Sequence, residues 1–169
     1  MSLYELTRDL HHACEQHPLG QRMVNGSITP QEWASWLWAM RVLHQVVDHD
    51  LPEHMCRNAA LTADLAVLPQ ARASRAAMHH AMHLIGHDAA GAAYVLHGAH
   101  CSGGRVLAPK MAKRGLPTAH TSYRDPEAVR AWLAEVRNKS VYADQARQTF
   151  VCLLEVMNET QGERRPAHG

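Results

Sequence analysis

Several features are missing from this sequence, and each absence excludes a class of protein. No C-x-x-C pair occurs among the widely spaced cysteines, which argues against a zinc ribbon or a redox dithiol. Reduced thiols in a cytoplasmic protein are therefore expected. No long basic run occurs and the formal net charge is +1, so nucleic acid is not an expected partner.

Long hydrophobic runs and strand patterns are also absent. Histidine, arginine and glycine interrupt the apolar stretches, so no membrane span is predicted. The first residues contain neither the basic nor the apolar region of a secretory signal. No convincing alternation of β-branched residues predicts a sheet. A chain of 169 residues can still bury a core, so one helical domain is expected.

Helical periodicity, together with start and stop signals, covers most of the chain. The strongest start is Thr29-Pro30-Gln31-Glu32, in which Thr29 caps the helix and Glu32 completes a capping box. The helices are predicted at residues 3–16, 19–25, 30–51, 58–68, 71–85, 88–114 and 142–159, with a further helix starting at Asp125-Pro126 and a disordered tail at 161–169.

What the chain does have is an unusual helix at residues 94–107, which contains Gly98, Gly103 and Gly104. Each interior glycine costs about 1 kcal/mol relative to alanine. Such glycines indicate either close helix packing or a flat cofactor lying against bare backbone. Histidine is also abundant, at 14 residues, and is a common ligand of metals and heme.

Two segments of the chain together resemble the biliverdin-producing heme oxygenase family. The first is Thr7-x-x-x-His11-x-x-x-Glu15, which is similar to the proximal heme helix of that family. The second is Tyr94 followed by the Ser-Gly-Gly step at residues 102–104, which is similar to the distal helix. The resemblance implies an all-α fold, with a single heme oxygenase-like helical bundle spanning residues 1–160.

The family's functional residues can be carried over to matching positions. His11 would be the ligand of the heme iron, with Glu15 orienting it. His12 is an alternative ligand, about 100° around the helix. The resemblance implies a heme-binding set of Thr7, His11, Glu15, Ser102, Arg137 and Phe150, and a distal, catalytic set of Tyr94, His100, Gly103 and Gly104. For the heme propionates, the candidates are Arg8, Arg130, Arg137 and Lys139.

The distal motif departs from the family pattern, because Ala99-His100 stands where the family has Gly-Asp. That aspartate organises the water that delivers protons in the family. Three interpretations of His100 remain: it assists bound oxygen, it ligates the iron opposite His11, or it points away from the heme. His97, one turn earlier, is a second candidate for the same roles.

The resemblance implies an oxidoreductase that cleaves heme to biliverdin and releases iron and carbon monoxide. Heme would be both substrate and cofactor, a reductase or ferredoxin would supply electrons, and the chain would be a monomer or weak dimer. One alternative is a non-catalytic heme-binding or heme-handling protein with bis-histidine ligation. Another is a heme-free or diiron relative, because metal-like spacings occur at His79, His83 and His87 and at Asp50 and His54.

Overall fold

The computed structural model describes residues 1–162, and these are helical with no strand among them. The α-helices are α1 (Leu3–Gln16), α2 (Pro18–Asn25), α3 (Pro30–Val47), α4 (Asn58–Ala66), α5 (Arg75–Leu84), α6 (Ala90–Gly98), α7 (Gly104–Lys113), α8 (Pro126–Arg137) and α9 (Ala143–Gly162). The short segments are η1 (Glu53–Met55), η2 (Ala99–Gly103), η3 (Ala119–Thr121) and η4 (Ser140–Tyr142).

Local sequence signals set most helix ends, as predicted. Thr29 and Glu32 form a reciprocal capping box at the start of α3, with Pro30 in the first turn. Asp125 caps α8 by accepting a hydrogen bond from the backbone of Ala128. Gly115 follows α7 with a φ of 70°, a left-handed conformation that favours glycine.

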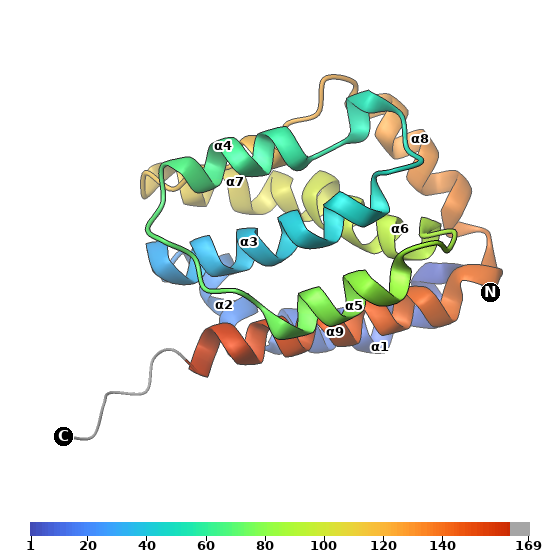
Figure 1. The fold of residues 1–169 in the computed structure, drawn as a ribbon, viewed down its shortest axis with the longest axis horizontal. Helices are drawn as coiled ribbons and strands as arrows, with labels where there is room; N and C mark the ends of the chain where they lie inside the picture. The colour runs from blue at the N-terminus through green and yellow to red at the C-terminus, as the bar shows by residue number, and fades with distance from the viewer. Residues whose placement is uncertain (163–169) are drawn as a thin grey trace.

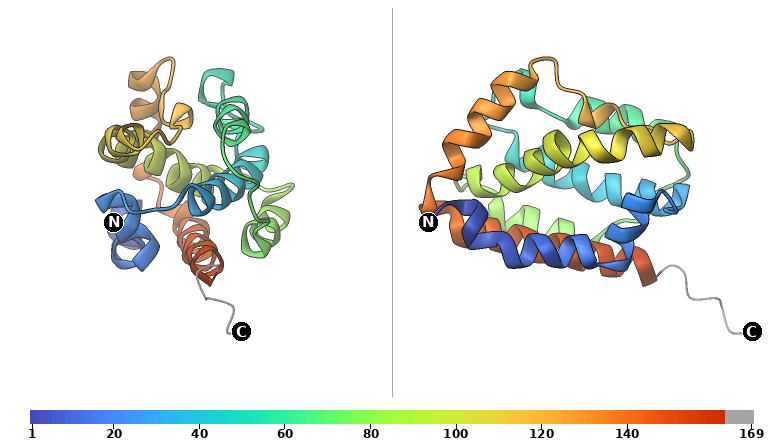
Figure 2. Two further views of the ribbon diagram at one scale, coloured as in Figure 1. Left: turned by 90° about the vertical axis from the view of Figure 1, so that its left-hand side faces the viewer. Right: turned by 180° about the vertical axis from the view of Figure 1, so that it is seen from behind.

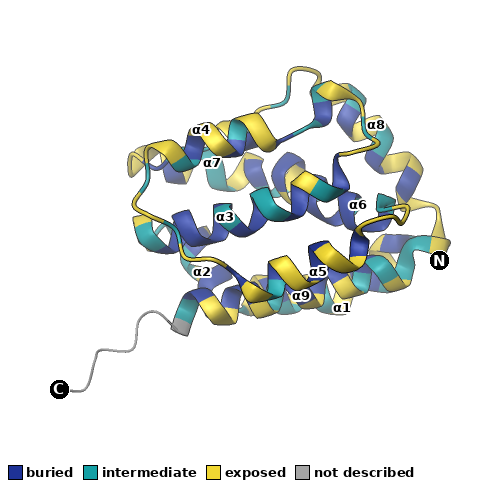
Figure 3. Ribbon diagram, in the orientation of Figure 1, coloured by how far each residue is buried: buried dark blue, intermediate teal, exposed yellow. Residues whose placement is uncertain are grey.

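Helix α3 is the centre of the fold and packs against α4, α5, α6 and α9. It runs through the middle of the molecule, with α4 on one side and α5 and α9 on the other (Figure 1). Much of its surface is buried (Figure 3), and Trp33, Leu37, Met40 and Leu43 are at most 2% exposed. Their burial is the main driving force for packing the bundle.

The glycine-containing helix is one continuous path built from α6, η2 and α7. Its middle part, η2, is a π-helical turn in which the N–H of Gly104 donates to the carbonyl of Ala99. Such turns bulge a helix and often occur at functional sites. Figure 2 shows this path and α1 lying on the same side of the molecule, one beside the other.

Three predicted helix boundaries differ from the structure by three or more residues. Helix α3 ends at Val47 rather than at Leu51, and the backbone of residue 48 adopts a capping conformation. Helix α5 starts at Arg75 rather than Ala71, because Ser74 is its cap. Helix α9 continues to Gly162, into the predicted tail; the remaining tail residues, 163–169, lie outside the described part of the chain.

No helix within residues 1–162 combines the length and the apolar character needed to cross a membrane.

Candidate functional site

The predicted proximal residue, His11, lies on α1 with its side chain 49% exposed. Its ring meets the ring of Phe150 from α9 edge-on, with 5.9 Å between the centroids. Its Nδ1 atom is 3.7 Å from Oε1 of Glu15, and the two side chains form an ion pair when the imidazole is protonated. His11 is therefore oriented by packing while much of its ring remains accessible.

Thr7, His11 and Glu15, which are spaced four residues apart on α1, become progressively more exposed along the helix. Thr7 is 2% exposed and donates a hydrogen bond to the carbonyl of Leu3, whereas the Glu15 side chain is 57% exposed. A step of four residues rotates about 40° around an α-helix, so the row drifts outward. The neighbouring His12 is more exposed still, at 68%.

The helical glycines separate into two kinds. A Cβ atom added to Gly98 or Gly103 would meet nothing within 4 Å, so open space lies beside both. A Cβ atom on Gly104 would lie 2.8 Å from Cβ of Thr121. Gly104 is thus a close-packing glycine, and its role on the distal side of the heme stays a prediction.

The remaining predicted site residues come from α6, the π turn η2 and α8. Tyr94 is half-buried, and burial raises its pKa. Ser102 is exposed on the π turn. Arg137, at the end of α8, holds its guanidinium 4.9 Å from the ring of Tyr4 on α1. Among the other propionate candidates, Lys139 is paired with Glu135.

His100 faces the interior rather than solvent. It is 4% exposed, and its Nε2 atom is 2.8 Å from Nε2 of His44 on α3. Its ring also meets that of His120 at a right angle, with 5.0 Å between the centroids. These contacts favour the interpretation in which His100 points away from α1.

His100 is part of a buried polar group, here named the Asp48 cluster, that consists of His44, Asp48, His97, His100 and Tyr123. Asp48 accepts hydrogen bonds from His44 Nδ1 at 2.9 Å and from His97 Nε2 at 2.7 Å. On the far side of the His97 ring, Nδ1 is 2.7 Å from the hydroxyl of Tyr123. The cluster joins α3, α6, η2 and the segment after η3.

Burial and hydrogen bonding set the protonation of the Asp48 cluster. Burial lowers the pKa of His44 to about 4 and that of His100 well below its ordinary value. Burial alone would raise the pKa of Asp48, but the hydrogen bonds from His44 and His97 outweigh it and hold that pKa well below its usual range. Burial also raises the pKa of Tyr123. At neutral pH the cluster therefore contains ionised Asp48, neutral His44 and His100, and a protonated Tyr123 that donates to His97.

A second buried pair, Asp64 and His120, lies next to the Asp48 cluster, because the rings of His120 and His100 are in contact. Asp64 on α4 accepts hydrogen bonds from His120 Nδ1 at 2.7 Å and from the backbone N–H groups of Ala119 and His120. Arg57 places its guanidinium 3.8 Å from the ring centroid of Tyr123. These contacts fix the 119–123 segment against the helices.

Sequence reasoning treated the helix at residues 30–51 as an apolar core element and missed His44 and Asp48. Their i, i+4 spacing was a usable signal, because such residues share one helix face. The histidine pairs with metal-like spacing at the surface do not form a comparable buried group. The rings of His79 and His83 lie 4.4 Å apart but exposed, and within residues 1–162 only His44, Asp48 and His97 form a group of three potential metal ligands.

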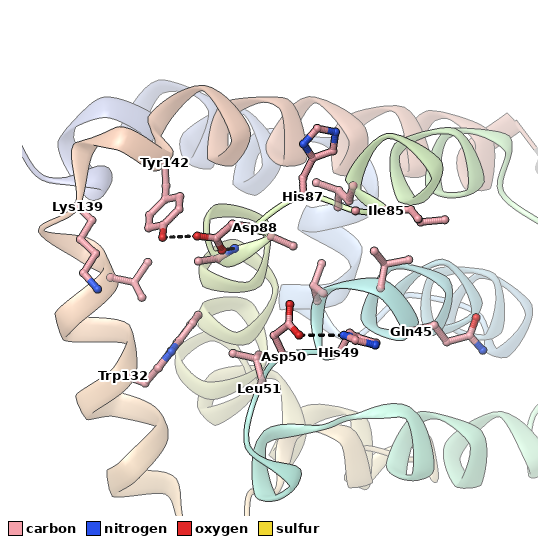
Figure 4. A pocket seen from close by; sticks show the side chains of 17 residues that line it. Gln45, His49, Asp50, Leu51, Ile85, His87, Asp88, Trp132, Lys139 and Tyr142 are labelled. Atoms are coloured by element: carbon pink, nitrogen blue, oxygen red, sulfur yellow. Dashed lines mark hydrogen bonds and ion pairs between the residues drawn. The ribbon is translucent and has the colours of Figure 1, made fainter.

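A separate cavity of about 830 Å³ opens beside the C-terminal end of α3 (Figure 4). Its lining comes from the end of α3, the α5–α6 connection and α8, and includes Trp132 and Lys139. Tyr142 donates a hydrogen bond to Asp88 across its rim at 2.6 Å. Of the residues predicted for the heme site, only the propionate candidate Lys139 lines this cavity.

Comparison with solved structures shows the fold. The chain is similar to heme oxygenase-1 from the cyanobacterium Synechocystis sp. PCC6803, solved in complex with heme, with a TM-score of 0.79 and 15% sequence identity. The match covers 95% of this chain and 91% of that one. No family model and no curated protein sequence matches. The predicted all-α heme oxygenase-like fold is therefore confirmed.

Proposed function

We propose that this protein is a heme oxygenase, which opens heme to biliverdin and releases iron and carbon monoxide. The observation that carries the proposal is the combination of a half-exposed His11 on α1 with open space beside Gly98 and Gly103 on the glycine-containing helix, which lies on the same side of the molecule (Figure 2). In a heme oxygenase-like fold, these two features provide an axial ligand and room for a flat macrocycle.

Each side chain has a role that follows from its position. His11 would bind the heme iron, and its edge-on contact with Phe150 restricts rotation of the imidazole. Gly98 and Gly103 would let the macrocycle approach the backbone, because neither glycine has a side chain in the way. Bound heme supplies the iron at which oxygen is activated, and a separate reductase or ferredoxin would supply the electrons.

Cations on the same side of the protein would neutralise the heme propionates. Arg8 and Arg130 are exposed, and Arg137 is already positioned over the ring of Tyr4. Because a guanidinium pairs well with a carboxylate, Arg137 is our first choice among the three.

A second candidate function is heme binding without turnover, and one observation favours it. His100 stands where the heme oxygenase family has its distal aspartate, while the nearby carboxylate of Asp48 is committed to His44 and His97. The bis-histidine form of this alternative has less support, because His100 is directed at His44.

Hemin titration of the heme-free protein, followed by visible spectroscopy, tests both functions. We expect a saturable one-to-one Soret band that decays to a biliverdin spectrum when ascorbate or a reductase is added in the presence of catalase. A stable spectrum under reductant would favour the binding protein, and the absence of saturable binding would overturn both proposals.

The matched variants are His11→Ala and His12→Ala, two neighbouring histidines on α1. Loss of the axial-ligand spectrum in the first and its retention in the second are expected, because only His11 is oriented by Phe150. The reverse pattern would assign the iron to His12.

A further inference from the structure

The interior of this protein holds metal-ligating groups where a purely apolar core would be expected. His44, Asp48 and His97 are at most 6% exposed and come from two different helices. One ligand atom of each lies within 4.8 Å of the other two. Burying carboxylates and histidines carries a desolvation cost, so we expect a buried group of this kind to serve a function.

We propose that His44, Asp48 and His97 bind one divalent transition-metal ion of the zinc or iron(II) class, at a site separate from the proposed heme site. Two imidazoles and one carboxylate form a donor set that both metals use, with at least one coordination position left for water or another ligand. His44 lies in the last turn of α3, Asp48 is the residue that directly follows this helix, and His97 on α6 completes the set.

The groups behind the three ligands match those that support metal sites. Metal-binding histidines usually use their second ring nitrogen in a hydrogen bond that fixes the ring. Here Nε2 of His44 is 2.8 Å from His100, and Nδ1 of His97 is 2.7 Å from the Tyr123 hydroxyl. Oδ2 of Asp48 also accepts a hydrogen bond from the backbone N–H of Arg57 at 2.9 Å.

The guanidinium of the nearby Arg57 does not pair with the carboxylate of Asp48. The guanidinium of Arg57 donates its hydrogen bonds to backbone carbonyl groups, those of His54, Met55, His120 and Ser122. The side chain of Asp48 therefore meets only the two histidine rings and one backbone N–H group among the hydrogen-bond donors described for it.

Metal binding requires a small rearrangement. The Asp48 oxygens are 2.9 and 2.7 Å from the two imidazole nitrogens, closer than ligands sit around an ion with bonds of about 2.0–2.2 Å. The side chains must therefore separate slightly. Both imidazoles then change tautomer without changing charge: His44 carries its proton on Nε2 and His97 carries its proton on Nδ1. His100 must then move its own proton to Nδ1, so that its Nε2 accepts from His44, and the Tyr123 hydroxyl must turn to accept from His97.

The decisive experiment is titration of chelator-treated, heme-free protein with Zn²⁺ and with Co²⁺. It is done in a His79→Gln/His83→Gln background, because that exposed histidine pair could bind metal by itself. We expect one zinc ion per chain by elemental analysis, a visible Co²⁺ spectrum typical of nitrogen and oxygen ligands, and a higher Tm with zinc.

Three single variants then locate the ion. Asp48→Asn and His97→Gln should each weaken zinc binding at least 100-fold. His120→Gln is the matched control: it also removes a buried histidine bonded to a carboxylate, Asp64, but should leave zinc binding within about 3-fold. No zinc bound in the surface-histidine background, or equal affinity in all three variants, would overturn the proposal.

If the ligand variants fail to fold, as judged by circular dichroism, Tyr123→Phe tests the proposed metal site instead. This variant keeps all three ligands and removes only the hydroxyl next to His97. We expect zinc affinity to fall about 10–100-fold, as is typical when a supporting group of a metal ligand is removed. Unchanged affinity in Tyr123→Phe would then overturn the proposal. Zinc binding retained in His11→Ala would show that this site is independent of the heme site.

Discussion

The Nε2 atoms of His44 and His100 lie 2.8 Å apart and connect α3 to the π turn of the glycine-containing helix. Nδ1 of His44 donates to Asp48, so Nε2 of the neutral imidazole accepts a hydrogen bond from Nε2–H of His100. This directional bond fixes the His100 ring in the interior, and it leads to the first prediction.

His100→Ala should reduce stability without changing the ligands of bound hemin. The free energy of unfolding should fall by about 1–3 kcal/mol, because His44 loses a buried hydrogen-bond partner. The spin state of the hemin complex, read from its visible spectrum, should stay as in the unmodified protein. A change from low-spin to high-spin hemin in the variant would instead identify His100 as an iron ligand.

The three glycines of the kinked helix should respond differently to alanine. Gly98→Ala should raise the free energy of unfolding by about 0.4–1 kcal/mol, because the residue is helical and its new Cβ meets only open space. Gly104→Ala should lower it by about 1–3 kcal/mol, because the added Cβ overlaps Thr121. Chemical denaturation measures both values, and equal effects would contradict the difference in packing.

A larger side chain at the same open positions tests the proposed heme face. Gly98→Leu and Gly103→Leu should weaken hemin binding while leaving the protein folded, because leucine would fill the space beside the helix. Exposed Val106 on α7 provides the control, and Val106→Leu should bind hemin normally. Unaltered affinity in both glycine variants would place the heme elsewhere.

The parts of this structure that were predictable are the local ones. Thr29, Pro30 and Glu32 specify the start of α3 through contacts within one turn, so the sequence pattern was sufficient. The overall fold could be predicted from the resemblance, because His11 and the glycine-containing helix keep the order and spacing of the family.

The parts that escaped prediction depend on packing between distant segments. Whether a glycine faces space or a neighbour depends on η3, which lies against Gly104 but not against Gly103. The partners of Asp48 include His97, 49 positions along the chain, and only the contact between α3 and α6 brings them together. Spacing along one helix indicates a shared face but not what that face meets.

Stability should fall as the pH is lowered through 6.5, with His80 as one cause. His80 is buried and donates a hydrogen bond to Thr149, and its burial, with the nearby His83 and His79, lowers its pKa below 6.5. The unfolded chain therefore takes up a proton more readily than the folded one in this range, so acid favours unfolding. Above pH 6.5 the effect disappears.

Urea unfolding at a series of pH values from 5 to 8 measures this dependence. His80→Gln should have a shallower decline in unfolding free energy below pH 6.5 than the unmodified protein, because one buried titrating group is gone. His87→Gln, which removes an exposed histidine that does not act on the pKa of His80, is the control. The same slope in His80→Gln and in the unmodified protein would show that His80 does not contribute.

Arg137 should interact with a heme propionate. It lies at the end of α8, held over Tyr4 of α1, so it needs little reordering to meet a carboxylate. Exposed ion pairs contribute about 0.2–1 kcal/mol, so Arg137→Gln should weaken hemin binding by up to about 5-fold. Repeating the titration with the dimethyl ester of hemin, which lacks the propionate charges, separates charge pairing from packing. The difference between Arg137 and Arg137→Gln should vanish with the ester, whereas a difference that persists would mean that the arginine acts by supporting Tyr4 and α1.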